Sequence, residues 1–235
     1  MYQAHDYCRT IASEPQLRSM AETVYDLVWR FDFSAPGFAV IETGVGCDSH
    51  TLRSWMVTLK ERLSDIGVRR GHGPFGYRSM SRFDQQQTTK FHLDGAPDQS
   101  LLMLGYEPSQ IRSRLFLADY IFAASQLGMT ADRFLQDFNP MFSEGEEMLN
   151  GYATELPQPM AGCSRIVLIN NSCQPWTEAR VHSLGVMHKA IVDTPDPAER
   201  RVINSTMLAL SEVDDFSLTQ RQEYIETDQI SPKLY

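Results

Sequence analysis

The 235-residue sequence has no apolar stretch approaching the ~20 residues that a membrane-spanning helix needs. Its first residues also have no basic segment followed by an apolar run, which is the pattern of a secretory signal. These two absences argue against the membrane-spanning and secreted classes of protein. We therefore expect a cytoplasmic protein with no membrane partner.

Cysteine and positive charge are both scarce. The four cysteines, Cys8, Cys47, Cys163 and Cys173, form no CxxC spacing, so we expect isolated reduced thiols and neither a zinc knuckle nor a redox pair. The chain has 21 Lys and Arg against 30 Asp and Glu, a net charge of −9, and no basic cluster. This charge balance argues against nucleic acids and anionic membranes as partners.

The remaining composition is that of a globular protein. Hydrophobic residues make up 42% and charged residues 22% of the chain, which excludes the disordered and fibrous classes and allows a sizeable core. A chain of this length commonly forms one large β domain. We expect a single domain over residues 1–235, with a helical lead at residues 1–75 and the core at residues 76–235.

The lead segment contains two helix patterns around one strand pattern. Residues 15–30 place apolar side chains at helical spacing, and the breakers of residues 34–37 end that pattern. Residues 38–42 predict a short strand. Asp48 or Ser49 is then a candidate N-cap for a second helix, whose apolar stripe we expect to be buried.

After the glycine-rich loop at residues 71–76 the patterns become mainly β. Extended segments are predicted at residues 77–84, 88–94, 100–106, 164–170 and 201–210. Residues 113–120 are ambiguous between helix and strand, and residues 123–138 predict a helix that is interrupted at Gly128. The fold class predicted is mainly β with flanking helices (α+β).

The predicted strand at residues 88–94 carries a histidine and an aspartate two positions apart. Side chains at positions i and i+2 of a strand point to the same face, so His92 and Asp94 can share one ligand sphere. Phe91 and Leu93 then point the other way, into packing. One strand would thus supply two metal ligands.

A third candidate ligand, His188, follows much later in the chain. Two neutral imidazoles and one carboxylate on one face of an octahedral metal are typical of non-haem Fe(II) oxygenases, which keep the other positions open. Considered alone, His92 is better explained as a hydrogen-bonded structural residue. The combination with Asp94 favours a ligand, and His182 is the substitute if His188 does not bind metal.

The order and spacing of these residues resemble the Fe(II)- and 2-oxoglutarate-dependent oxygenase superfamily, whose double-stranded β-helix carries a His-x-Asp motif, a distal histidine and then a basic residue. His92 and Asp94 match the motif, His188 matches the distal histidine, and Arg201 matches the basic residue that opens the last core strand. The resemblance covers roughly the last two-thirds of the chain. It implies a double-stranded β-helix (jelly roll) core with N-terminal helices, holding Fe(II) at His92, Asp94 and His188.

The resemblance also implies 2-oxoglutarate as cosubstrate, dioxygen as oxidant and a small-molecule substrate, with hydroxylation as the commonest outcome. The far carboxylate of 2-oxoglutarate needs a cation, and a guanidinium offers it a planar, bidentate partner that stays ionised. We expect Arg201 in this role, with the Ser205 hydroxyl on the same face of the strand. If the register slips by one residue, Arg200 takes the role.

Two other functions fit the same residues. One keeps the fold and the metal without 2-oxoglutarate, as in a cupin-like dioxygenase, isomerase or hydrolase, and the other is a metal-free jelly-roll binding protein. Arg78, Arg82 and Lys90 lie at even offsets from His92, so they face either the same cavity or, as we expect, a solvated rim. Trp176 lies in a polar loop, either as a lid residue or, as we expect, in packing.

Overall fold

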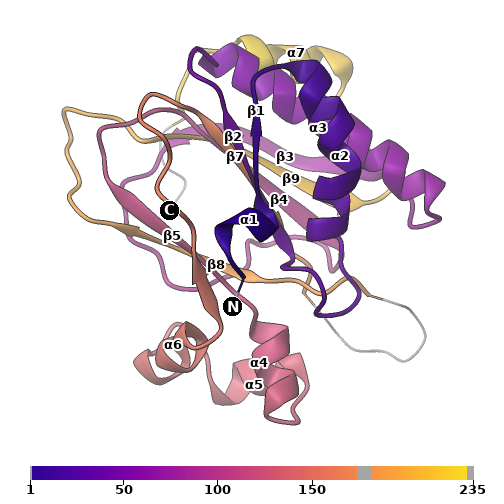
Figure 1. Ribbon diagram of the computed structural model, residues 1–235, viewed down its shortest axis with the longest axis vertical. Helices are drawn as coiled ribbons and strands as arrows, with labels where there is room; N and C mark the ends of the chain where they lie inside the picture. Colours follow the sequence, from indigo (N-terminus) through magenta and orange to yellow (C-terminus); the bar gives the residue numbers. More distant parts are fainter. Residues whose placement is uncertain (1, 174–181, 232–235) are drawn as a thin grey trace.

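The computed structural model describes residues 2–173 and 182–231, which form a mixed α/β structure of helices and two β-sheets (Figure 1). The helices are α1 (Ala4–Tyr7), α2 (Glu14–Val28), α3 (Ser49–Arg69), α4 (Tyr120–Gln126), α5 (Ala131–Asp137), α6 (Ser143–Asn150) and α7 (Leu218–Glu226). The strands are β1 (Cys8–Ile11), β2 (Phe38–Thr43), β3 (Phe75–Asp84), β4 (Ser100–Tyr106), β5 (Ser113–Ala118), β6 (Ala153–Glu155), β7 (Arg165–Asn170), β8 (Met187–Val192) and β9 (Val202–Leu210). None of the described helices is both long and apolar enough to cross a bilayer.

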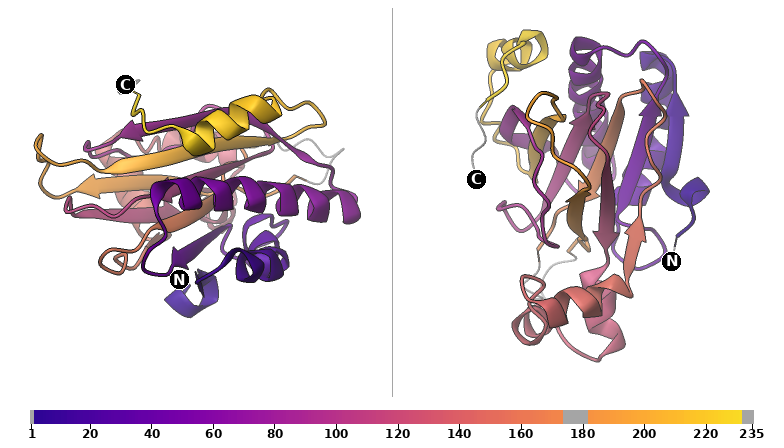
Figure 2. Two further views of the ribbon diagram at one scale, coloured as in Figure 1. Left: turned by 90° about the horizontal axis from the view of Figure 1, so that it is seen from above. Right: turned by 90° about the vertical axis from the view of Figure 1, so that its left-hand side faces the viewer.

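The strands form a six-stranded sheet in the order β1-β2-β7-β4-β9-β3 and a three-stranded sheet in the order β6-β5-β8. From β3 onward the chain moves repeatedly between them: β3, β4, β7 and β9 lie in the larger sheet, and β5, β6 and β8 in the smaller one. The pairs in this part are antiparallel, and β1 pairs with β2 in parallel. Helices α2 and α3 cover one face of the larger sheet, and the smaller sheet lies against the other (Figure 2).

Strand β4 shows how the sequence builds these layers. Leu101 and Met103 pack against the helices α2 and α3, whereas Leu102 and Leu104 face the space between the two sheets. Alternate side chains of a strand point to opposite faces, so a strand covered on both sides needs an unbroken apolar run. The central strand of the larger sheet has this run.

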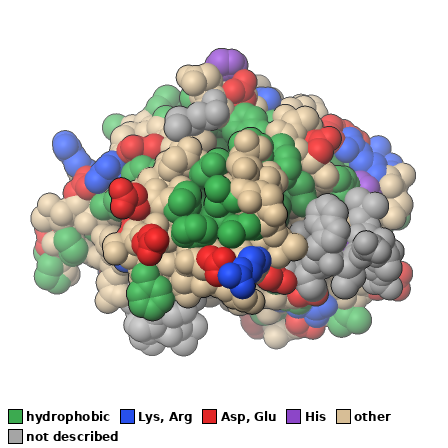
Figure 3. Space-filling view, turned by 90° about the horizontal axis from the view of Figure 1, so that it is seen from below, with side chains coloured by type: hydrophobic (Ala, Val, Ile, Leu, Met, Phe, Trp, Pro, Cys, Tyr) green, Lys and Arg blue, Asp and Glu red, His purple; other side chains and the backbone are tan. Residues whose placement is uncertain are grey.

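Helices α4, α5 and α6 lie beyond one end of the strands (Figure 1). They share a third hydrophobic cluster with residues at that end of the smaller sheet, such as Phe116 and Met187. Seen from this end, the surface gathers hydrophobic side chains near its middle (Figure 3). Leu127, Met141 and Phe142 are the exposed large hydrophobic residues of this helical part.

The helical lead at residues 1–75 contains two strands ahead of β3, one more than the sequence predicted. It contains β1 and β2, which together extend the larger sheet at one edge. The strand pattern of residues 38–42 predicted β2 correctly. The edge strand β1 was missed because its four residues, with Arg9 and Thr10 in the middle, are too few and too polar to show a period.

The segment at residues 88–94 is the second correction, because it is not a regular strand. It runs along the edge of β8, where the Thr89 hydroxyl accepts a hydrogen bond from the Ala190 N–H at 2.9 Å and the Thr88 hydroxyl accepts one from the Val192 N–H at 3.1 Å. These hydroxyls occupy positions that backbone carbonyls fill in a regular ladder. The segment is therefore held extended without a continuous backbone ladder.

The structure also shows how residues 113–138 fold, which the sequence left partly open. The ambiguous residues 113–120 form β5 and the start of α4, and the single helix predicted at residues 123–138 is divided between α4 and α5. Gly128 lies between these helices with φ = 66°, a left-handed conformation that favours glycine. The predicted interruption at Gly128 is confirmed.

Helix α3 begins as predicted, with Asp48 as its N-cap. The Asp48 carboxylate accepts a hydrogen bond from the Thr51 N–H at 2.7 Å. We expect Asp48→Ala to lower the free energy of unfolding by about 1 kcal/mol, because it leaves a first-turn N–H without this partner. The same hydrogen bond holds the pKa of Asp48 below its usual 3.8, so its contribution persists above that pH and is lost as the pH falls through the lowered pKa.

Urea unfolding at neutral pH would measure this effect. Asp48→Asn keeps an acceptor oxygen and is the matched control, for which we expect a stability close to that of the unaltered protein. Equal unfolding midpoints for the Ala and Asn variants would contradict the capping role.

Candidate metal centre

His92, Asp94 and His188 lie together at the end of the strands nearer α4. One ligand atom from each lies within 4.8 Å of the others. The Asp94 Oδ1 atom is 3.4 Å from His92 Nε2 and 3.9 Å from His188 Nε2. Among the described residues this is the one group of three or more His, Cys, Asp or Glu side chains close enough to hold a metal ion. The structure thus brings together the three ligands expected from the sequence.

The backbone places the two histidines side by side. His92 and His188 form an antiparallel bridge in which each N–H donates to the other's carbonyl at 3.0 Å. Residues that exchange both hydrogen bonds project their side chains on the same side. Their ring centroids are consequently 4.2 Å apart.

The His92 ring is oriented by the chain just before it. Its Nδ1 lies 2.7 Å from the Lys90 carbonyl oxygen, which only accepts hydrogen bonds, so Nδ1 carries the proton. The other ring nitrogen, Nε2, faces the Asp94 carboxylate at 3.4 Å and is the nitrogen available to a metal. Metal-binding histidines commonly donate their other N–H to a carbonyl in this way, which fixes both the tautomer and the ring.

His188 is held in its neutral form. It is buried, and this burial, followed by the charge of His92, lowers the pKa of His188 to about 4. An imidazole with this pKa is uncharged at neutral pH, which is the state that binds a metal. Its Nδ1 is buried and finds no hydrogen-bond partner among the described residues.

Asp94 is the ionised member of the group. Burial acts to raise the pKa of Asp94, but the hydrogen bond to His92 and the charges of His188 and His92 outweigh it and hold this pKa below 3.8. For His92, burial acts to lower the pKa, while the hydrogen bonds to Asp94 and Lys90 outweigh that effect and raise it above 6.5. The group therefore offers a carboxylate between two imidazoles.

This donor set fits an octahedral first-row metal. Adjacent ligands about 2.1 Å from such a metal lie about 3 Å apart. The separations of 3.4 and 3.9 Å exceed this value by less than 1 Å, which small side-chain rotations remove. The side chains of His92 and Asp94 are 34% and 28% exposed, so the group opens to solvent and leaves room for further ligands.

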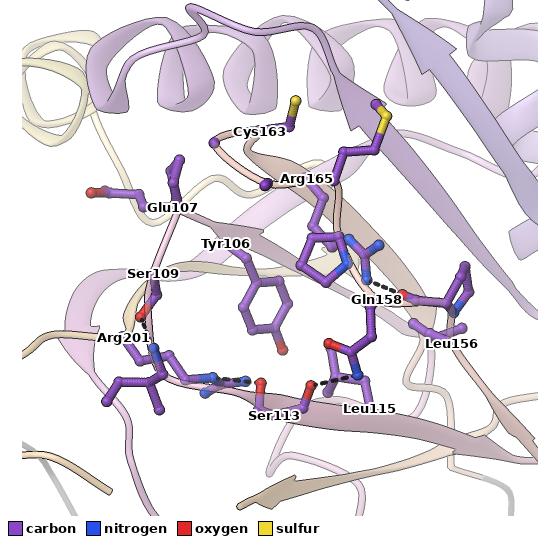
Figure 4. Close-up of a pocket in the computed structure, with 17 residues that line it drawn as sticks. Tyr106, Glu107, Ser109, Ser113, Leu115, Leu156, Gln158, Cys163, Arg165 and Arg201 are labelled. Atoms are coloured by element: carbon purple, nitrogen blue, oxygen red, sulfur yellow. Dashed lines mark hydrogen bonds between the residues drawn. The ribbon is translucent and has the colours of Figure 1, made fainter. Parts of the chain in front are cut away.

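Arg201 lies in a cavity of about 110 Å³ between the two sheets (Figure 4). Its Nε donates to Ser113 Oγ at 2.9 Å and its Nη1 donates to the Gln85 carbonyl at 2.8 Å. The Tyr106 ring points into the cavity, with its centroid 5.1 Å from the guanidinium carbon. The Arg201 Nη2 is buried and has no partner among the described residues. The cavity thus contains a cation with an unused donor.

The inner face of β9 connects this cavity to the metal group. Ile203 and Met207 face the space between the sheets. Arg201 and Ser205 are separated from them by two positions along the extended chain, so they point to the same side. Both polar residues are buried, at 3% and 8% exposure. Arg200 is exposed, so the register directs Arg201 inward.

The cavity and the metal group lie toward opposite ends of the strands. On β5, Leu117 pairs with His188, whereas Ser113, which binds Arg201, lies four residues earlier. None of the three candidate ligands lines the cavity. Burial raises the pKa of Tyr106, and the neighbouring Arg201 charge opposes that rise.

The other residues considered from the sequence lie elsewhere. The three basic residues before the motif bind separate carboxylates, namely Arg78 to Asp215, Arg82 to Glu107 and Lys90 to Glu146. Lys90 is exposed as expected, but the Arg82 side chain is only 9% exposed and does not form a solvated rim. His182 is not part of the metal group, because its Nδ1 contacts Gln99 Nε2 at 3.2 Å. Trp176 lies outside the described residues.

Sequence reasoning missed Asn171, which contacts the metal group directly through the Asp94 backbone. Its side chain accepts a hydrogen bond from the Asp94 N–H and donates one to the Asp94 carbonyl, both at 2.9 Å. The available signal was the pair Asn170-Asn171 at the end of an apolar strand, which is unusual in a core. Tyr106 and Ser113 were missed because only the fold brings them to Arg201.

No protein-family model and no curated protein sequence matches the chain. Among solved structures, the crystal structure of asparagine oxygenase aligns with 87% of this chain and 93% of that chain, at 10% identity and a TM-score of 0.41. Any assignment of function therefore has to come from the geometry of the site itself.

Proposed function

We propose that this protein is an Fe(II)- and 2-oxoglutarate-dependent oxygenase that oxidises a small molecule, with hydroxylation as the outcome. The observation that carries the proposal is the convergence of His92, Asp94 and His188 on one point that is open to solvent. Two neutral imidazoles and one carboxylate suit Fe(II) and leave positions for exchangeable ligands.

Each of the three residues has a defined role in this proposal. His92 and His188 bind the metal through nitrogen, and Asp94 binds it as a carboxylate that offsets part of the metal's charge. Iron held here would supply the activation of dioxygen. The Lys90 carbonyl keeps the proton on Nδ1 of His92, so Nε2 is the nitrogen that would bind the metal, and burial keeps His188 neutral. Because the pKa of His92 is raised, metal binding at Nε2 would release the proton that this nitrogen carries at low pH.

The strand order supports a double-stranded β-helix as the core of this enzyme. We propose that the seven strands β3 to β9, together with the extended segment at residues 88–94, correspond to the eight strands of a jelly roll. Of these strands, β3, β4, β7 and β9 lie in the larger sheet and β5, β6 and β8 in the smaller one, with residues 88–94 beside β8. We propose one domain over residues 1–235, since strands from the lead and from the core share one sheet.

Arg201 is the proposed anchor for the far carboxylate of 2-oxoglutarate. The Nη2 of this buried guanidinium has no described partner, and a carboxylate would satisfy it with a charge-assisted hydrogen bond. The two bonds to Ser113 and Gln85 fix the orientation of the guanidinium beforehand. The Ser205 hydroxyl, on the same face of β9 toward the metal group, is the proposed second donor.

A second candidate function keeps the metal and does not use 2-oxoglutarate. One observation favours it, namely that no candidate metal ligand lines the cavity that contains Arg201. A cupin-like dioxygenase, isomerase or hydrolase needs the metal group without this cavity.

An anaerobic titration of the metal-free protein with Fe(II), and then with 2-oxoglutarate, tests both candidates. A weak visible charge-transfer band that needs both additions and is absent from His92→Ala is the result expected of the oxygenase. Stoichiometric iron binding without the band would support the second candidate. No iron binding would return the histidines to structural roles in a metal-free jelly-roll protein.

A further inference from the structure

Asn171 follows β7 directly, and its side chain pairs with the backbone of Asp94. The Asn171 Oδ1 accepts from the Asp94 N–H, and the Asn171 Nδ2 donates to the Asp94 carbonyl, each at 2.9 Å. The amide thus imitates a residue of a neighbouring strand, with one donor and one acceptor. Asn171 is only 1% exposed, so these bonds do not compete with water.

Asp94 has little other support. The chain last pairs with β8 at His92 and next joins a sheet at Ser100, the start of β4, so Asp94 belongs to no strand. Among the described residues, no other hydrogen bond reaches its backbone N–H or carbonyl. A methyl group added at the next residue, Gly95, would meet no atom within 4 Å, so packing does not confine this turn either.

Asn171 is itself firmly attached to the larger sheet. Its backbone N–H donates to the Ser100 carbonyl at 3.0 Å, and its own carbonyl accepts from the Ser100 hydroxyl at 3.3 Å. The same hydroxyl lies 3.3 Å from Asn171 Nδ2. The Asn171 side chain therefore attaches Asp94, a loop residue, to strands β4 and β7.

We infer that Asn171 is a positioning residue that holds the Asp94 carboxylate in register with His92 and His188 for metal binding. This inference rests on the proposed metal site. Partners that orient a metal ligand commonly contribute about 10–100-fold to metal affinity, because a ligand that must be ordered on binding binds more weakly. We expect Asn171→Ala to lose affinity in that range.

Asn170 provides the matched control. It is the preceding residue and fully buried, and its side chain donates to the Val28 carbonyl at 2.9 Å and to Ser183 Oγ at 2.6 Å. It has no hydrogen bond to any candidate ligand. Asn170→Ala should therefore lower thermal stability without changing the affinity for metal.

The experiment is an anaerobic titration with Co(II), which substitutes for Fe(II) and reports its own coordination through its visible d–d bands. The unaltered protein and both Ala variants are titrated, and the melting temperature of each metal-free protein is recorded. We expect Asn171→Ala to bind Co(II) about 10–100-fold more weakly, with altered d–d bands, and Asn170→Ala to bind it normally. Asn171→Asp, which has a similar shape but lacks the donor, should also bind weakly and replaces Asn171→Ala if that variant does not fold.

Two results would overturn the inference alone, and a third would overturn it together with the proposed function. Normal affinity and normal d–d bands in the Asn171 variants would remove the positioning role while leaving the proposed metal site intact. An equal loss of affinity in Asn170→Ala would show that general loosening of this region, and not the contact with Asp94, weakens the site. Failure of the unaltered protein to bind Co(II) or Fe(II) would instead overturn the proposed function and this inference together.

Discussion

His188→Ala should abolish stoichiometric iron binding. The variant loses one of three donor atoms, and the two that remain, from His92 and Asp94, come from a segment that is not itself a regular strand. Loss of a partner that only orients a ligand costs about 10–100-fold, so loss of a ligand should cost more than about 100-fold in affinity. Anaerobic loading with Fe(II), removal of free metal and iron analysis would measure the bound fraction.

His182→Ala is the control for this result. His182 is the next nearest histidine in sequence and bonds to Gln99, outside the metal group. We expect this variant to retain one iron per chain and His188→Ala to retain none, with similar circular dichroism for both metal-free proteins. If His182→Ala lost its iron and His188→Ala kept it, His182 would be the third ligand, which would contradict the geometry of the site.

Arg201→Ala should bind 2-oxoglutarate at least roughly 30-fold more weakly. Removal of one partner of a buried, hydrogen-bonded charge pair costs about 2 kcal/mol or more, and about 1.4 kcal/mol corresponds to a tenfold change in Kd. Arg201 is only 3% exposed, so water does not replace its guanidinium effectively. Titration of the Fe(II)-loaded protein with 2-oxoglutarate under anaerobic conditions gives the affinity directly.

Arg200→Ala and Arg201→Lys are the matched controls. Arg200 is adjacent but exposed, so its removal should leave 2-oxoglutarate affinity unchanged. Lysine keeps the charge and loses the planar fork, so Arg201→Lys should have an intermediate affinity. Unchanged 2-oxoglutarate binding in Arg201→Ala, with iron binding intact, would place the cosubstrate elsewhere and favour the metal enzyme that does not use it.

Secondary-structure elements with a clear local sequence signal were predictable. The apolar run of β4 and the N-cap of α3 at Asp48 needed no information beyond a few neighbouring residues. The short strands β1 and β6 have four and three residues, too few to show a period. Residues 88–94 have a strand-like pattern, but side-chain hydroxyls replace part of their ladder, which no local pattern reveals.

The residues of the candidate site also fall into a predictable group and an unpredictable one. His92 and Asp94 were recognisable because two positions on an extended segment share a face. The roles of Asn171 and Tyr106 were missed, because each acts on a partner far away in sequence through a contact that only the fold creates. The orientation of Arg201 depended on the register of β9, which is set by pairing with β3 and β4.

The pairing of β3 with β9 joins a strand in the first half of the chain to one near its end. The bridge between His92 and His188 is similarly remote in sequence, so the ligands meet only after most of the chain has folded. Chains dominated by such distant pairings fold slowly. A metal that binds only the completed structure stabilises it by mass action and slows its unfolding. If the site holds iron as proposed, the iron-free protein should therefore unfold faster than the iron-loaded protein.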